Sequence, residues 1–198
     1  MLKDTIELLN YLEIDSAHVI GHSMGGGIAQ GLTIEYLDRV KSLTRISSST
    51  SNPNLPRAKS EVMEALNVPF SPVREKNIDQ AINIYRVLYG PFRLFDEDFI
   101  RKLSGIAFER SFYPDGVVRK SAMIMSSGSR NEQLKKLKIK ALVIHGDVDP
   151  LISVEAAEDT ANSIPESKLL IIKGMGHELA YEDISQIIPV IVEFFKGI

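Results

Sequence analysis

The chain has 198 residues, of which 44% are hydrophobic and 25% charged, and its formal net charge is −3. This composition is typical of one globular domain, or of one domain with an insertion, and the small negative charge argues against nucleic acid or an anionic membrane as a partner. The sequence has no cysteine, which excludes disulfides and a cysteine nucleophile. We identify neither a secretory leader nor an apolar run of the ~18 residues that a membrane span needs, so we expect a cytoplasmic protein.

Helical and strand patterns alternate along both ends of the chain. Apolar runs predict four strands, at 17–20, 40–47, 141–144 and 169–172. Apolar residues at helical spacing predict helices at 4–12, 25–37, 154–163 and 184–196. The last two strands are continuous apolar runs, as expected of parallel strands that are covered on both faces. This alternation indicates an α/β fold with a parallel sheet.

A long segment interrupts the alternation between the second and third strands. It opens with a polar, proline-containing run, and prolines separate the helical patterns that follow, at 58–66, 78–88, 98–112 and 117–125. We interpret residues 51–137 as a helical insertion. The core domain would then consist of residues 1–50 and 138–198.

The segment from Val19 to Gly27 is the most informative about chemistry. A strand pattern ends in Gly21-His-Ser23-Met-Gly25, and a helical pattern follows. Gly-x-Ser-x-Gly between a strand and a helix is the pattern of the nucleophile elbow, which exposes a serine hydroxyl on a sharp turn. We expect glycine at positions 21 and 25 because a side chain there would crowd the turn.

A serine nucleophile needs a histidine base, and that base needs a carboxylate to orient it. The chain offers these groups in the order Ser23, Asp149, His177, which is the order in elbow enzymes. Each of the three follows a predicted strand, and open α/β sheets place their sites at the carboxyl ends of strands. Asp147 is a rival acid, although a role in the turn suits it better.

Three motifs in order carry a family resemblance: Gly-His-Ser-Met-Gly-Gly at 21–26, His-Gly-Asp-Val-Asp-Pro at 145–150, and Gly-Met-Gly-His at 174–177. Together they resemble the α/β-hydrolase superfamily, in its serine esterase-like branch. The resemblance implies that Ser23 is the nucleophile and His177 the base. It also implies that Asp149 is the acid, since the family's acid usually stands three residues after the glycine of the His-Gly pair. The helical insertion falls where the family has its cap.

The resemblance also implies that part of the family fold is absent. The family sheet has about eight strands, and this sequence supplies what look like the last four, so that about 80 to 100 residues are missing. Those residues would carry one donor of the oxyanion hole, whereas the other donor, the backbone N–H of Met24, is retained. The strand at 17–20 would then be an exposed apolar edge, open to a second copy or to a complementing chain.

Several residues near these motifs have plainer interpretations. His22 and His145 lie beside the motifs, and we expect packing or hydrogen-bonding roles for both. A metal site made of Asp147, Asp149 and His177 lacks the usual ligand spacing, and we expect no metal and no organic cofactor. Apolar residues of the insertion are candidates for a substrate pocket, although packing within the cap is the better explanation for any one of them: Phe92, Phe95, Phe99, Phe108, Phe112, Met123 and Met125.

The sequence therefore predicts a half-sheet of an α/β-hydrolase fold with a helical cap. Its predicted function is the hydrolysis of small-molecule carboxylic esters or related acyl substrates. The alternative is a truncated or degenerate hydrolase without turnover of its own, which needs a complementary N-terminal segment or self-association.

Overall fold

The computed structural model describes residues 1–198, apart from the side chain of Met125. Its strands form one parallel sheet in the order β1 (Ala17–His22), β2 (Val40–Ile46), β3 (Lys140–Gly146) and β4 (Glu166–Ile172). The four predicted strands and their parallel pairing are confirmed. Because all strands run the same way, the loops that follow them meet at one edge of the sheet.

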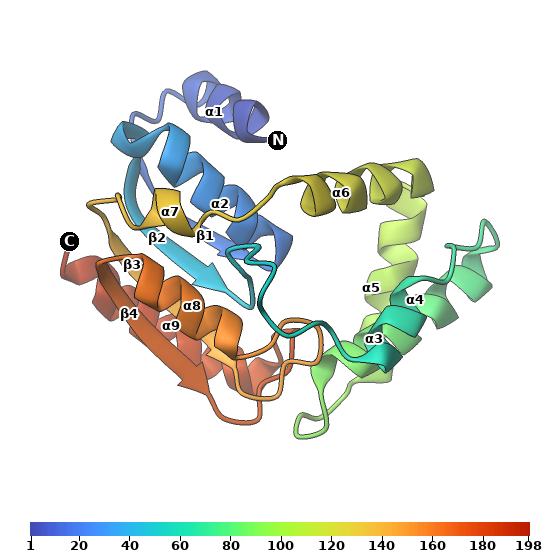
Figure 1. Cartoon of the computed structure of the whole chain (residues 1–198). Coiled ribbons are helices and arrows are strands. Elements are labelled where there is room, and N and C mark those ends of the chain that lie inside the picture. Colours follow the sequence, from blue (N-terminus) through green and yellow to red (C-terminus); the bar gives the residue numbers. More distant parts are fainter.

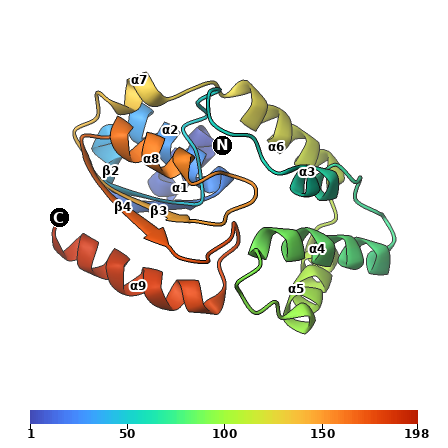
Figure 2. The same cartoon turned by 60° about the horizontal axis from the view of Figure 1, so that its bottom comes forward.

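Helices cover both faces of this sheet (Figures 1 and 2). On one face lie α2 (Met24–Glu35), α7 (Asn131–Leu134) and α8 (Glu155–Ser163), and α1 (Leu2–Tyr11) packs beside α2. On the opposite face lies α9 (Tyr181–Lys196). A short 3-10 helix, Leu37–Arg39, leads from α2 into β2.

The core consists of one apolar cluster on each face of the sheet. Leu32, Leu43 and Leu134 belong to the cluster under α2, and Ile144, Ile187 and Phe194 belong to the cluster under α9. The expectation of cover on both faces holds for β3, whose residues from Ala141 to Gly146 are all buried. It is wrong for β4, because this strand is at the sheet edge and leaves side chains such as Leu169 exposed.

Five helices lie between β2 and β3, and all of them except α7 extend away from the sheet (Figure 1): α3 (Ser60–Leu66), α4 (Arg74–Tyr89), α5 (Glu97–Arg110) and α6 (Pro114–Ser126). Buried isoleucines on α4 and α5 form a third, smaller apolar cluster. The division at residues 51 and 137 stays a prediction. Leu134 and Leu137, at the end of the predicted insertion, pack in the cluster under α2. Among the described residues, no helix has the length and apolar character needed to cross a membrane.

Candidate active site

Ser23 lies at the turn between β1 and α2, in a backbone conformation that few residues other than glycine adopt. Its φ is 52° and its ψ is −120°. Its backbone N–H donates to the carbonyl of Ile46 at the end of β2, at 2.9 Å, and its own carbonyl accepts from the N–H of Gly26, at 2.9 Å. A non-glycine residue persists in such a conformation only where its surroundings enforce it, and such residues concentrate at functional sites.

Only one of the two glycines that flank Ser23 in the motif is needed for steric reasons. A Cβ atom on Gly21 would lie 2.2 Å from the carbonyl oxygen of Gly25, a distance that no real contact allows. A Cβ on Gly25 would meet no atom within 4 Å, so the expected crowding at Gly25 is wrong. The crowded position is instead Gly26, where a Cβ would lie 2.6 Å from the side chain of Ser48.

The structure brings together Ser23, His177 and Asp149, which are far apart in the sequence. The Nε2 atom of His177 lies 2.8 Å from the Ser23 Oγ, and its Nδ1 lies 2.8 Å from the Asp149 Oδ2. A carboxylate only accepts, so Nδ1 carries the proton and Nε2 is free to accept from the serine hydroxyl. His177 is 2% exposed and Asp149 is 8% exposed, which keeps this chain of hydrogen bonds largely out of water.

The two neighbouring acids of the 145–150 motif have different roles. Asp149 accepts from His177 with one oxygen, and its Oδ1 accepts from the backbone N–H groups of Leu151 and Ile152, both at 2.9 Å. Asp147 instead accepts from the N–H of Gly174 at 2.6 Å, which ties the loop after β3 to the loop after β4. The geometry therefore places Asp149, and not Asp147, beside the histidine.

His22 and His145 support the loops that carry this histidine and this acid. The Nε2–H of His22 donates to the carbonyl of His177 at 2.9 Å. The Nε2–H of His145 donates to the carbonyl of Ile152 at 2.9 Å and also lies 3.4 Å from the Asp149 Oδ2. Burial lowers the pKa of His145 below its ordinary value, although the Ile152 carbonyl and Asp149 oppose this effect.

The end of α4 fixes the backbone of His177 from the side of the insertion. The His177 N–H donates to the carbonyl of Leu88 at 2.7 Å. A Cβ on the preceding residue, Gly176, would lie 2.4 Å from the carbonyl oxygen of Tyr89, so only glycine allows this close approach. No sequence pattern indicated the Leu88 contact, because a backbone carbonyl leaves no signature in the residue types.

A buried ion pair connects the same two parts of the chain. Arg93 follows α4, and its Nε and Nη2 donate to the Asp183 Oδ1, at 2.8 and 2.6 Å, in the first turn of α9. Its Nη2 also donates to the Lys173 carbonyl at 2.8 Å, in the loop that leads to His177. The sequence did not indicate this pair, since nothing in the residue pattern relates positions 90 residues apart.

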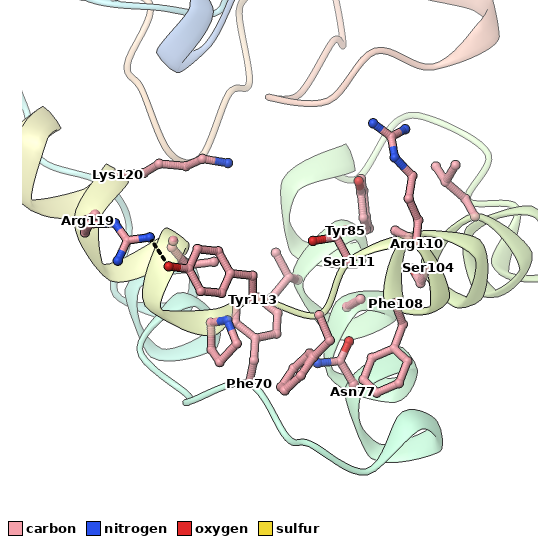
Figure 3. A pocket seen from close by; sticks show the side chains of 18 of the residues that line it. Phe70, Asn77, Tyr85, Ser104, Phe108, Arg110, Ser111, Tyr113, Arg119 and Lys120 are labelled. Atoms are coloured by element: carbon pink, nitrogen blue, oxygen red, sulfur yellow. Dashed lines mark hydrogen bonds between the residues drawn. The ribbon is translucent and has the colours of Figure 1, made fainter. Parts of the chain in front are cut away.

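A cavity of about 1000 Å³ lies among α4, α5 and α6 and reaches the loop that carries His177 (Figure 3). Leu88 and Glu178, which adjoin the His177 contact, both line it. Of the apolar residues that the sequence suggested for a pocket, Phe108, Phe112 and Met123 line this cavity. Phe92 and Phe99 are exposed elsewhere, Phe95 packs on the isoleucine cluster, and the Met125 side chain is outside the described residues.

The described side chains include no group of three or more His, Asp or Glu residues arranged to hold a metal ion. The chemistry that the arrangement does offer is proton transfer along a serine, a histidine and a carboxylate.

Comparison with known proteins identifies relatives along most of the chain. The profile of the alpha/beta hydrolase fold family matches residues 1–184. Rhodomycin D methylesterase DnrP of Streptomyces peucetius is 23% identical over 195 residues, which cover 89% of this chain and 65% of the relative. Monoacylglycerol lipase ABHD6 of Mus musculus is 25% identical over 190 residues, which cover 91% of this chain and 55% of the relative. The chain thus spans about 55 to 65% of the length of these relatives.

Solved structures share the fold. The 2-hydroxy-6-oxo-6-phenylhexa-2,4-dienoate hydrolase BphD of Rhodococcus sp. strain RHA1 superposes with a TM-score of 0.79 at 20% identity, over 98% of this chain and 69% of that chain. The meta-cleavage product hydrolase CumD of Pseudomonas fluorescens IP01 superposes with a TM-score of 0.77 at 21% identity, over 99% of this chain and 70% of that chain. At these identities the likeness shows the fold alone.

Proposed function

The chain belongs to the alpha/beta hydrolase fold family, and on that premise we propose that it hydrolyses carboxylic esters or related acyl substrates with Ser23 as nucleophile. The observation that carries the proposal is the hydrogen-bonded series from Ser23 through His177 to Asp149, with both distances at 2.8 Å. Strain at Ser23 and the buried state of His177 and Asp149 support it, because activated nucleophiles are held in this way.

In the first step, the Ser23 Oγ attacks the ester carbonyl carbon while its proton passes to the His177 Nε2. The tetrahedral intermediate then collapses, the bond to the leaving alcohol breaks, and His177 returns the proton to that oxygen. Water attacks the resulting acyl-serine with His177 again as base, which releases the acid and restores Ser23. Asp149 holds the Nδ1 proton and stabilises the imidazolium that forms in each step.

The backbone N–H of Met24 is the proposed oxyanion donor. Met24 is the first residue of α2, so its N–H has no partner inside the helix and lies at the positive end of the helix dipole. A donor of this kind contributes about 10²- to 10³-fold to the rate when it is aimed at the developing oxyanion.

Ester substrates are also compatible with the names of the relatives, since one is a methylesterase and another a monoacylglycerol lipase. We test the proposal with 4-nitrophenyl esters and paired variants of the two neighbouring acids. Asp149→Asn is expected to lower kcat by about 10⁴-fold, because the amide favours the wrong histidine tautomer. Asp147→Asn keeps an acceptor for the Gly174 N–H and is expected to retain most activity. Full activity in Asp149→Asn would overturn the assignment.

We propose as an alternative that these residues need a second polypeptide for turnover, either another copy or a complementing segment. The free edge of β1 favours this alternative, because among the described strands β1 pairs only with β2 and its Ile20 is 49% exposed.

A further inference from the structure

The cavity among α4, α5 and α6 has an uneven distribution of charge. Its walls are mainly apolar and include Phe70, Phe108 and Phe112. Three cationic residues line it, Arg110, Arg119 and Lys120, whereas Glu178 is the only acidic residue among the described residues that line it. A bound molecule would therefore meet both apolar surface and an excess of positive charge.

Two of the three cations are available to a ligand. Arg119 donates to the Tyr113 hydroxyl at 2.5 Å, and its guanidinium stacks 4.9 Å from the centre of the Tyr113 ring. Arg110 and Lys120 form no hydrogen bond or ion pair with any side chain that the structure describes. The hydroxyl of Ser104 in the cavity wall is also buried without a partner among those residues.

The charged and aromatic groups occupy different parts of the cavity. Figure 3 shows Arg110 and Lys120 well separated from Phe70 and Phe108, on the side nearer the ribbon of the sheet core. Arg110 extends toward that ribbon, and Lys120 extends from α6 across the open space beside it. Glu178 and Leu88 connect the cavity to His177 on that side, since the Leu88 carbonyl accepts from the His177 N–H at 2.7 Å. A molecule in the cavity would thus place its apolar part among the aromatic rings and its charged part nearer the core.

We propose that the substrate is an acyl ester with an apolar acyl chain and a negatively charged leaving group. This inference rests on the proposed function and narrows its substrate class. The acyl chain lies among the aromatic side chains, and the scissile carbonyl is presented to Ser23. The anionic group of the leaving alcohol pairs with Arg110 and Lys120.

A matched pair of chromogenic esters tests the proposal. In 4-nitro-3-(octanoyloxy)benzoate the leaving group carries a carboxylate, and 2-nitrophenyl octanoate is the same ester without it. We expect kcat/KM to be about 10-fold or more higher for the anionic ester at low ionic strength, because hydrogen bonds to charged groups are the stronger ones. The preference is expected to shrink as salt screens the exposed charges of Arg110 and Lys120.

Variants assign the preference to the cavity. Arg110→Gln and Lys120→Gln are each expected to lower the ratio of the two kcat/KM values several-fold. Lys102→Gln is the matched control, because Lys102 is an exposed cation on the same helix as Arg110 but does not line the cavity. It is expected to leave the ratio unchanged, and circular dichroism checks that each variant is folded.

The outcomes separate this proposal from the proposed function. Equal rates for the two esters would overturn the substrate class while leaving the esterase intact. Hydrolysis of neither ester by the folded protein would instead count against the function. In that case, titration calorimetry with Ser23→Ala still tests the cavity: tighter binding of the anionic ester supports the proposal, and equal binding of both esters overturns it.

Discussion

Asp149 is held by more partners than any other group of the candidate site. One of its oxygens faces His177 and His145, and the other accepts two backbone N–H groups. A buried carboxylate with this many donors stays in one orientation, so it also fixes the ring of His177. The sequence indicated Asp149 through its place in the 145–150 motif, but not the two N–H groups or His145 that position it.

We predict that His145 makes the stability of the protein sensitive to pH. Burial lowers its pKa in the folded state, so the unfolded chain binds a proton more readily near pH 6.5. Its contribution to the free energy of unfolding is therefore expected to decrease as the pH falls through about 6.5. Urea unfolding at several pH values measures how the free energy of unfolding changes with pH, and His145→Gln should weaken this pH dependence. An unchanged pH dependence in His145→Gln would show that other groups cause it.

At the scale of elements, the turn from β1 to α2 has room for a side chain at one of its two motif glycines but not at the other. Gly21→Ala forces a Cβ against the Gly25 carbonyl and is expected to destabilise the protein by about 1–3 kcal/mol. Gly25→Ala places its Cβ in open space at the start of a helix, and its effect is expected to stay below about 1 kcal/mol. Urea unfolding compares the two variants, and equal losses would contradict this account of the turn.

The loop after α4 is attached to the start of α9 by the Arg93–Asp183 pair. The Asp183 side chain is completely buried, so Arg93→Ala would leave a buried carboxylate without its cation. Removal of one partner of such a pair typically costs about 3–5 kcal/mol. Lys135→Ala breaks an exposed pair with Glu132 and serves as the control, for which little change is expected. Thermal unfolding of both variants gives the comparison, and a harmless Arg93→Ala would contradict it.

The elements that the sequence predicted are those with long or strongly patterned runs. All four strands were predicted, because apolar runs bounded by polar residues are distinctive. The helix α7 was missed because its four residues are too few to show a period. The exposure of β4 was also missed, since the place of a strand within a sheet depends on the order of strands and not on the strand's own residues.

At the scale of the whole molecule, the sheet has two free edges, β1 and β4. Free edges with exposed apolar side chains favour pairing with another chain. We predict association through β1 that increases with protein concentration, measured by size-exclusion chromatography with light scattering. Ile20→Lys is expected to shift the protein toward monomer, whereas Leu169→Lys, on the exposed opposite edge, is the matched control. Loss of association only in Leu169→Lys would assign the contact to β4.

The central claim is that Ser23 is an activated nucleophile, and covalent labelling with a fluorophosphonate tests it most directly. Intact-mass spectrometry of the folded protein should show one adduct, located on Ser23 by peptide mapping, that is absent from Ser23→Ala and much slower to form in His177→Gln. A folded protein that gains no adduct, or that is labelled equally well in His177→Gln, would contradict the claim.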